Sequence, residues 1–365
     1  SVLILAATIS SSVIQPFFGY FSDRRSLPWL MPLGPFLGGL GVALVGIAPS
    51  YGATFGAVLI AGVGVAAFHP EASRFANYVS GSRRSSGMSL FSVGGNIGFA
   101  LGPALVTPLV LVLGLHGTLL LIVPTWVMGT VLVRALPRLS SFRPEPVAQA
   151  AASDRPADAW GPFALLGVVI ALRSFVYFGF VTFIPLYYVH VLHAGKATGG
   201  AALTAMLVGG AVGTLAGGPL ADRFGRRTVL VGSMLMLPGL IVGFLLSGPA
   251  LAIVFAVLAG AATVATFAVT IVIGQELLPA RIGVASGVTI GLSIGLGGVG
   301  APLLGIFGDA HGLRAVFELL VAFPIAAALM SIWLPATGRH AGSPGPDASA
   351  RQACAGSSAG TLTSL

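Results

Sequence analysis

Arg173 is the residue in this sequence best suited to holding a charged solute. It lies near the middle of the apolar run from Pro162 to Leu192, and Tyr177 and Tyr187 follow it in the same run. A guanidinium can hold a carboxylate or phosphonate through paired, planar hydrogen bonds, and aromatic rings can line the path of such a solute. A structural role is the alternative, in which Arg173 pairs with a buried acid or with backbone carbonyls.

His69 and Glu71 are the residues best placed to carry a proton. They flank Pro70 at the end of another apolar run, and Arg74 lies three residues after Glu71. Histidine titrates near neutral pH and a partly buried glutamate can be tuned toward it, so either residue could couple protonation to a conformational change. An ordinary ion pair between Glu71 and Arg74 is an equally good interpretation.

Two amides inside apolar runs, Asn96 and Gln15, complete the set of candidate solute contacts. Hydrogen bonding between helices is the more common use of such amides. Glu276, at the end of a further apolar run, is interpreted as an interfacial acid. The one cysteine, Cys354, excludes a disulfide framework, and no cluster of acids, histidines and cysteines has metal-site spacing. We therefore expect neither a metal nor a cofactor.

The composition places these residues in a membrane protein. Of the 365 residues, 56% are hydrophobic and only 8% are charged, and the mean hydropathy is +0.98. No water-soluble fold could bury so much apolar surface. A net charge of +8 would suggest nucleic-acid binding in a soluble protein, but here the basic residues stand between long apolar runs. We expect the lipid bilayer as a partner and no nucleic acid.

Eleven apolar segments are long enough to cross a bilayer core, which needs about 20 helical residues. They predict an all-α membrane protein and run over 2–20, 27–48, 52–68, 86–114, 118–136, 162–192, 197–220, 228–246, 251–277, 282–307 and 313–334. A segment rich in proline, alanine and charge separates the fifth from the sixth. The expected organisation is an N-terminal half with five spans (1–136), a linker (137–160), a C-terminal half with six spans (161–336) and a disordered tail (337–365).

The distribution of basic residues predicts the orientation of the segments. All but three of the 18 Lys and Arg residues lie in alternate loops, the linker or the tail, which therefore face the cytoplasm. The exceptions are Lys196, Arg314 and Arg173. The chain then starts on the opposite side, and five segments before the linker against six after it predict one further helix ahead of Val2 in the complete protein.

A motif that occurs twice indicates two homologous halves. GYFSDRR begins at Gly19 and GPLADRFGRR begins at Gly218, which is 199 residues later, and Ser86-Gly87 is echoed by Ser286-Gly287. The glycine permits close approach of backbones, and the acid can face the positive start of a helix. We expect Asp23 to cap the segment that starts at Ile282, and Asp222 to meet Ser85 and Ser86. The predicted cytoplasmic gate comprises Gly19, Asp23, Arg24, Gly218, Asp222, Arg223, Gly225 and Arg226. Charged loops that only obey the positive-inside rule are the alternative.

The second copy of the motif is similar to the signature G-x-x-x-D-R-x-G-R-R of the major facilitator superfamily. AAFHPEASRFANYVSG, from Ala66, and SLFSVGGNIGFALGP, from Ser89, resemble the fosmidomycin-resistance branch of that superfamily. The resemblance implies two pseudo-symmetric halves with twelve helices in the complete protein, and export of a small anionic or zwitterionic antimicrobial compound in exchange for protons. It also implies a bacterial inner membrane, with the linker and C-terminus in the cytoplasm. The first copy departs by losing its second glycine, and Val58 stands where many drug antiporters of the superfamily carry an arginine.

Other classes of function fit the sequence less well. It contains no H-E-x-x-H, no nucleophile elbow and no phosphate-binding Walker loop, so neither an enzyme nor an ATP-driven pump is expected. A proton-coupled uptake carrier for a small organic solute remains an alternative, because the direction of transport depends on coupling. A non-transporting membrane scaffold is the alternative if the first helix is truly absent. We expect a monomer.

Overall fold

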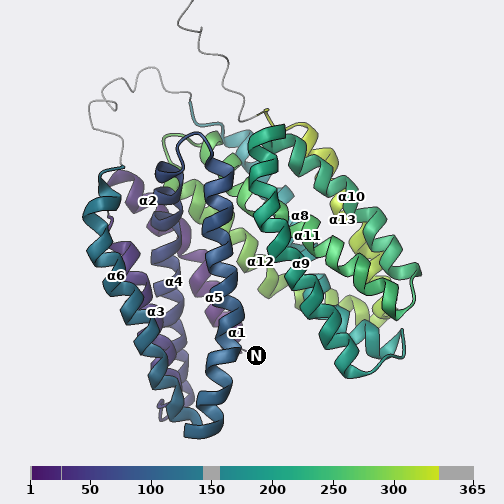
Figure 1. The fold of residues 1–365 in the computed structure, drawn as a ribbon, viewed down its shortest axis with the longest axis horizontal. Helices are drawn as coiled ribbons and strands as arrows, with labels where there is room; N and C mark the ends of the chain where they lie inside the picture. Colours follow the sequence, from purple (N-terminus) through teal and green to yellow (C-terminus); the bar gives the residue numbers. More distant parts are fainter. Residues whose placement is uncertain (1, 26, 143–156, 337–365) are drawn as a thin grey trace, which may run out of the picture.

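Two bundles of helices make up the part of the chain that the computed structural model describes, residues 2–25, 27–142 and 157–336 (Figure 1). Every regular element in these ranges is helical, so the predicted all-α fold is confirmed. The predicted tail and most of the predicted linker lie outside the described residues.

The first bundle contains the five segments predicted before the linker. Its elements are α1 (Val2–Val13), α2 (Gln15–Arg24), α3 (Leu30–Val45), α4 (Tyr51–Val79), α5 (Arg84–Leu113), the 3-10 helix η1 (Gly114–Leu121) and α6 (Ile122–Ser140). The predicted segment 2–20 forms two helices because Pro16 lacks the amide hydrogen that would continue the helix, and the break falls at Ile14.

The second bundle contains the six segments predicted after the linker. Its elements are α8 (Trp160–His190), α9 (Lys196–Phe224), α10 (Arg226–Leu246), α11 (Pro249–Leu277), α12 (Ile282–His311) and α13 (Leu313–Ile332). Gly225 (φ 94°) and Gly312 (φ 89°) make the sharp connections after α9 and α12, a backbone conformation that glycine adopts without strain. The position equivalent to Gly225 in the first copy of the motif, Ser26, lies outside the described residues.

Eight helical stretches in the described residues are long and apolar enough to cross a membrane. Several helices are longer than the hydropathy of the sequence predicts. α4 continues to Val79 and α9 to Phe224, so Arg74 and Asp222 lie on helices and not in loops. α6 continues through Pro137 to Ser140, so the linker starts later than predicted. Hydropathy marks only the part of a helix that lies in hydrocarbon, so it does not predict these polar ends of the helices.

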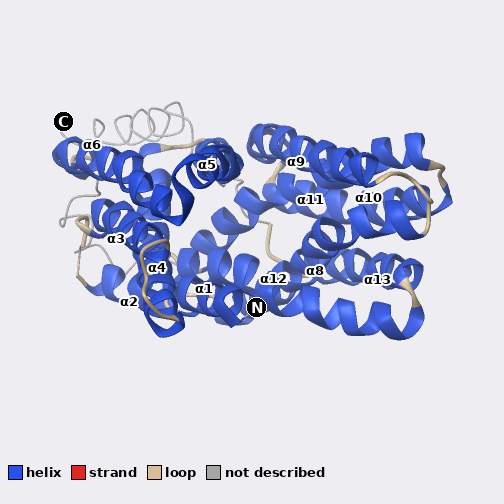
Figure 2. Cartoon of the chain, turned by 90° about the horizontal axis from the view of Figure 1, so that it is seen from below, coloured by secondary structure: helices blue, strands red, loops and turns tan. Residues whose placement is uncertain are grey.

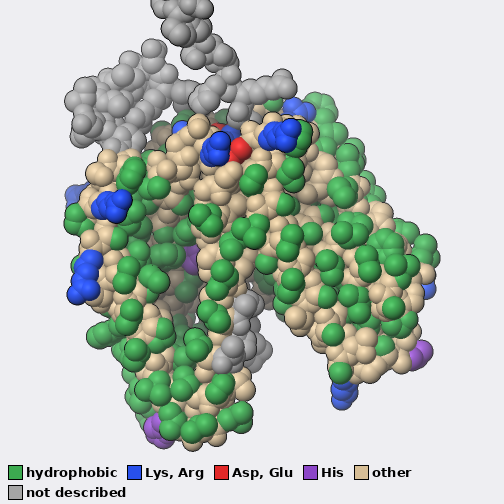
Figure 3. All heavy atoms as spheres, in the orientation of Figure 1, with side chains coloured by type: hydrophobic (Ala, Val, Ile, Leu, Met, Phe, Trp, Pro, Cys, Tyr) green, Lys and Arg blue, Asp and Glu red, His purple; other side chains and the backbone are tan. Residues whose placement is uncertain are grey.

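The two bundles meet at one end and diverge toward the other (Figure 1), and the space-filling view shows a crevice between them (Figure 3). Basic side chains gather at the end where the bundles meet (Figure 3). We call it the arginine-rich end: Arg24 and Arg223 lie in the last turns of α2 and α9, and Arg84, Arg226 and Arg281 lie at the starts of α5, α10 and α12. The crevice therefore opens on the opposite side of the molecule.

The contact surface between the two bundles, which we call the seam, follows a repeated pattern. α12 of the second bundle packs against α1, α2 and α4, and α5 of the first bundle packs against α9 and α11. Figure 2, which views the molecule from below, shows the two groups of helices on opposite sides of this seam. α5 and α12 therefore occupy equivalent places in the two bundles.

One side of α5 is open, although the equivalent side of α12 is covered. Gly297 and Gly300 of α12 face Phe178 and Phe175 of α8. Four glycines of α5 have no described atom within 4 Å of the point where a Cβ would lie: Gly94, Gly95, Gly98 and Gly102. A groove of about 430 Å³ also runs along α6. The additional helix expected from the sequence stays a prediction.

Candidate functional site

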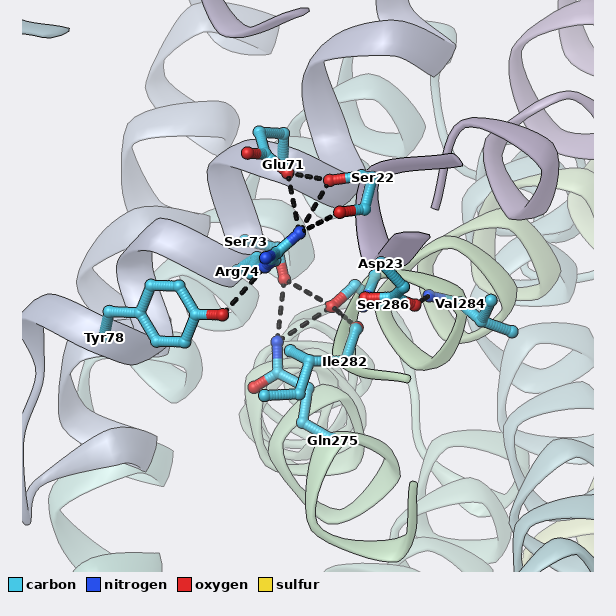
Figure 4. A network of polar contacts seen from close by, with 11 residues as sticks. Ser22, Asp23, Glu71, Ser73, Arg74, Tyr78, Gln275, Ile282, Val284 and Ser286 are labelled. Atoms are coloured by element: carbon cyan, nitrogen blue, oxygen red, sulfur yellow. Dashed lines mark hydrogen bonds and ion pairs between the residues drawn. The ribbon is translucent and has the colours of Figure 1, made fainter. Parts of the chain in front are cut away.

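Asp23, in the last turn of α2, caps the start of α12 in the other bundle. Its two carboxylate oxygens accept hydrogen bonds from the backbone amides of Gly283 and Val284, both at 2.8 Å (Figure 4). The first amides of a helix have no partner within the helix and carry partial positive charge, so a carboxylate is stabilising there. The contact predicted for Asp23 is confirmed.

Asp222 makes the equivalent contact from the second bundle to the first. Its carboxylate accepts hydrogen bonds from the amides of Ser85 (3.1 Å) and Ser86 (2.9 Å) and from the Ser86 hydroxyl (2.7 Å), at the start of α5. This predicted contact is confirmed as well. The two acids thus join the bundles at the arginine-rich end by the same means in opposite directions.

The motif glycines allow the helices to come this close. A Cβ on Gly19 would overlap the backbone of Gly283, and a Cβ on Gly218 would overlap the backbone of Ser85 and Ser86. The close approach predicted for these glycines is therefore present in both copies. Without it, neither carboxylate could reach the amides of the opposing helix.

Gly218→Ala should consequently destabilise the closed seam by about 1–3 kcal/mol, the usual cost of overpacking. The unfolding temperature in detergent should fall. Gly200→Ala is the matched control, because Gly200 lies on the same helix with nothing within 4 Å of its missing side chain. That substitution should leave the unfolding temperature unchanged or raise it slightly, since alanine favours helix over glycine. Equal effects of the two substitutions would contradict the packing role of Gly218.

The basic residues of the motif divide into two groups. Arg226 is buried: its Nε donates to the Ser85 hydroxyl (2.8 Å), and its guanidinium pairs with Glu276 (2.5 Å) and more distantly with Asp222 (3.8 Å). Arg24 and Arg223 are exposed instead, and their guanidinium groups lie over the rings of Tyr20 and Phe224. Arg226 is therefore part of the seam, whereas the contacts of Arg24 and Arg223 in the described residues stay within their own helices.

Glu71 is fully buried in α4 and joins that helix to α2 (Figure 4). Its carboxylate accepts a hydrogen bond from the Ser22 hydroxyl and lies 3.4 Å from Nη1 of Arg74. The same nitrogen of Arg74 donates to the Ser22 carbonyl (2.5 Å), and Nε donates to the Tyr78 hydroxyl (2.8 Å). Glu71 is thus linked to the residue next to Asp23, and the ion pair foreseen between Glu71 and Arg74 is present.

His69 has a more local environment. Its Nδ1 lies 2.8 Å from the Val65 carbonyl one turn earlier, and its ring packs edge-on against Phe68. Both contacts are within α4. His69 is consequently less connected to the seam than Glu71.

Arg173 is buried inside the second bundle, between α8, α11 and α12. Its Nη2 donates to the Ser293 hydroxyl (3.0 Å), and its guanidinium carbon lies 5.5 Å from the centre of the Phe267 ring. Nε has no hydrogen-bond partner, and no ion pair involves Arg173 within the described ranges. Phe267 also packs against the apolar cluster that joins the bundles, formed by Met88, Ala268, Ile271, Val272 and Ile290. The guanidinium charge therefore lies next to the seam, on the side of the second bundle, and no acid neutralises it in the described residues.

The remaining candidate solute residues are not gathered around Arg173. Tyr177 is half-buried one turn further along α8, but Tyr187 is enclosed by the rings of Phe244 and Phe317 in the core of the second bundle. Asn96 is exposed on α5. Gln15 is buried at the start of α2, where Nε2 donates to the Ser11 carbonyl (2.7 Å) and Oε1 has no partner.

Several seam residues had no role predicted for them from the sequence, although Ser73 and Asn77 lie in the run from Ala66 and Ser286 in the repeated Ser-Gly pair. Gln275 of α11 contacts Ser73 and Asn77 of α4 and Ser286 of α12 (Figure 4 shows Gln275 and the two serines). Serine is common in membrane helices, and only the pairing of distant segments makes these serines notable. The same holds for Ser293 beside Arg173.

Comparison with known proteins places this architecture in a family. The sequence profile of the Major Facilitator Superfamily matches the chain twice, over residues 1–203 and 166–356, so the chain belongs to that superfamily. Its members are transporters and not enzymes. The expected family is thereby confirmed.

Two curated relatives cover most of the chain. It is 34% identical to the "Uncharacterized MFS-type transporter YfnC" of Bacillus subtilis (strain 168) over 336 residues, which is 89% of this chain and 82% of the relative. It is 31% identical to the "Fosmidomycin resistance protein" of Escherichia coli (strain K12) over 348 residues, 92% of this chain and 83% of the relative.

Solved structures support the fold. The chain is similar to the transporter FucP in its outward conformation, with a TM-score of 0.72 and 17% identity, covering 92% of this chain and 90% of that one. It is also similar to the human organic anion transporter MFSD10, with a TM-score of 0.71 and 18% identity, covering 90% of this chain and 83% of that one. The predicted major-facilitator-type fold is confirmed.

Proposed function

We propose that this protein exports a small anionic or zwitterionic compound from a bacterial cytoplasm in exchange for protons, by alternating access between its two bundles. The single observation that carries the proposal is the buried guanidinium of Arg173, which lacks an acidic partner in the described residues. A charge in the interior of a membrane protein is costly, and an anionic solute entering the seam would compensate it. The relative named for fosmidomycin resistance supports export and suggests a phosphonate as probe.

The arginine-rich end faces the cytoplasm under this proposal, in agreement with the positive-inside rule. The state described here is then closed toward the cytoplasm by Asp23 and Asp222 and open on the outer side. Transport requires the reverse arrangement as well, in which α12 leaves α2 and α5 leaves α9. The two capped helix starts act as a gate that favours the outward-facing state.

Right-side-out vesicles loaded with fosmidomycin test direction and coupling together. Proton exchange predicts that efflux of the compound acidifies the lumen, because protons enter as the compound leaves. A symporter used for uptake would make the lumen more alkaline during the same efflux. Efflux without any movement of protons would refute coupling, and absence of efflux would refute transport of this probe.

Asp222→Asn should loosen the gate. Loss of the charge at the start of α5 removes about 0.3–1 kcal/mol of helix-terminus stabilisation, so the seam should open toward the cytoplasm about two- to fivefold more often. The measurement is the rate at which a thiol introduced by Met88→Cys, at a buried seam position in a Cys354→Ser background, reacts with a membrane-impermeant maleimide from the cytoplasmic side. Asp309→Asn, an exposed acid at the far end of α12, is the control. An unchanged rate in Asp222→Asn would remove Asp222 from the gate.

A further inference from the structure

Four uncharged side chains form a buried cluster at the seam, which we call the amide cluster: Ser73 and Asn77 of α4, Gln275 of α11 and Ser286 of α12. Nε2 of Gln275 donates to the hydroxyls of Ser73 (3.1 Å) and Ser286 (2.8 Å), and Oε1 accepts from Nδ2 of Asn77 (2.6 Å). The Ser73 hydroxyl also donates to that of Ser286 (3.0 Å). Each of the four residues is at most 5% exposed.

Three of these hydrogen bonds connect the first bundle to the second. They join Asn77 to Gln275, Gln275 to Ser73, and Ser73 to Ser286. Gln275 takes part in two of them and uses both its amide donors and its oxygen. A residue that only filled space in α11 would not need an amide with every group engaged, since buried polar groups are costly unless they are paired.

The last turn of α11 contacts two helices of the first bundle, α4 and α5. Gln275 hydrogen-bonds to α4, and Oε1 of its neighbour Glu276 lies 3.8 Å from Nη1 of Arg84, at the start of α5. Glu276 also pairs with Arg226 of its own bundle. Two consecutive residues thus bind two different helices across the seam, so this turn must release both before the cytoplasmic side can open.

We propose that Gln275 is a positioning residue for transport, a latch that holds α4 against α11 and α12 in the outward-facing state and is independent of the two carboxylates. This inference rests on the proposed alternating access. Amide and hydroxyl hydrogen bonds are replaced by bonds to water at little net cost when a seam opens, so the latch biases the equilibrium and still breaks in every cycle. In the inward-facing state the four side chains line the cytoplasmic entrance as polar, hydrated groups.

The test follows opening of the seam in the full-length protein. Met88→Cys serves as the reporter in a Cys354→Ser background, because Met88 is fully buried in the apolar cluster between the bundles and outside the amide cluster. In inside-out vesicles, Gln275→Ala should accelerate reaction of the reporter with an impermeant maleimide by about tenfold, since two hydrogen bonds across the seam are lost. Asn77→Ala loses one of them and should accelerate it about threefold.

Thr263→Ala is the matched control, because Thr263 is a buried polar residue of the same helix whose hydroxyl donates only to the Ala259 carbonyl. It should leave the labelling rate unchanged. Wild-type rates in both Gln275→Ala and Asn77→Ala would overturn the latch, and Asn77→Ala decides alone if Gln275→Ala does not fold.

The outcomes separate the latch from the proposed function. Faster labelling in Asp23→Asn together with wild-type labelling in Gln275→Ala would refute the latch and leave the carboxylate gate standing. Faster labelling in Gln275→Ala, in a protein whose wild type moves neither fosmidomycin nor protons, would support the latch and refute export of fosmidomycin in exchange for protons.

Discussion

Replacing Arg173 with alanine is expected to weaken equilibrium binding of fosmidomycin by about 100-fold or more. Paired, charge-assisted hydrogen bonds from a guanidinium to a phosphonate contribute about 3 kcal/mol, and burial makes the site dry. Arg173→Lys keeps the charge but loses the planar pair of donors, so it should bind with intermediate affinity. Binding of labelled fosmidomycin to the purified protein is the measurement.

The stability and the binding of a third variant, Arg173→Met, test whether the charge is there for the solute. If Arg173 stabilised the fold by pairing with a buried acid, its removal would lower the free energy of unfolding by about 3–5 kcal/mol. Nε of Arg173 has no partner, so Arg173→Met should instead leave the unfolding temperature in detergent unchanged or raise it. Loss of binding without loss of stability is the signature of a solute residue.

Arg314→Ala is the matched control for the binding measurement. Arg314 pairs with Glu318 on the exposed surface of α13, with more than half of each side chain exposed. An exposed pair of this kind adds little to stability, and it lies outside the proposed path. Wild-type binding by Arg173→Ala, or equal losses in Arg173→Ala and Arg314→Ala, would end the hypothesis.

The sequence was informative where a physical requirement repeats. Apolar runs of spanning length predicted the helices, and the duplicated glycine and aspartate predicted which helix starts Asp23 and Asp222 would cap. Both features can be recognised from the sequence alone, because the thickness of the bilayer sets the length of the helices and the free amides at a helix start set the position of the carboxylate.

The lining of the solute path was harder to predict for a reason specific to membranes. Lipid, the core of a bundle and an aromatic path all favour apolar side chains, so the face to which a tyrosine points is not encoded in hydropathy. Tyr187 illustrates this, because Phe244 and Phe317 from two later helices enclose it. The placement of Tyr187 in a closed core does not favour its proposed contact with solute.

The amide cluster could not be predicted because its members are individually ordinary. Ser73 and Asn77 of α4 lie 202 and 198 residues before Gln275 in the chain, and the Ser286 hydroxyl also donates to the Ile282 carbonyl of its own helix (2.8 Å). Only the arrangement of α4 against α11 and α12 gives them a shared role. Pairwise contacts across a seam require knowledge of the packing.

Protonation at Glu71 offers a route from the proton to the seam. Glu71 and Arg74 both contact Ser22, and the next residue, Asp23, holds the start of α12. A proton on Glu71 would cancel the charge that holds Arg74 and so release the last turn of α2. Under the proposed proton exchange, we expect the carboxylate state to favour the closed gate and the protonated state to favour opening, which is the differential effect that coupling requires.

Glu71→Gln should therefore abolish the exchange of fosmidomycin for protons, because the amide cannot gain or lose a proton, while it leaves exchange of fosmidomycin for fosmidomycin intact. In loaded vesicles, acceleration of efflux by an outside-acid pH gradient should fall at least about tenfold, to a rate that no longer depends on pH. His69→Gln is the decisive comparison, since the hydrogen bond to the Val65 carbonyl and the ring contact with Phe68 both lie within α4, so loss of the imidazole should leave the pH response in place. A pH response that disappears in His69→Gln and persists in Glu71→Gln would transfer the proton to the histidine, and loss of solute-for-solute exchange in Glu71→Gln would show that Glu71 serves binding or folding instead of coupling.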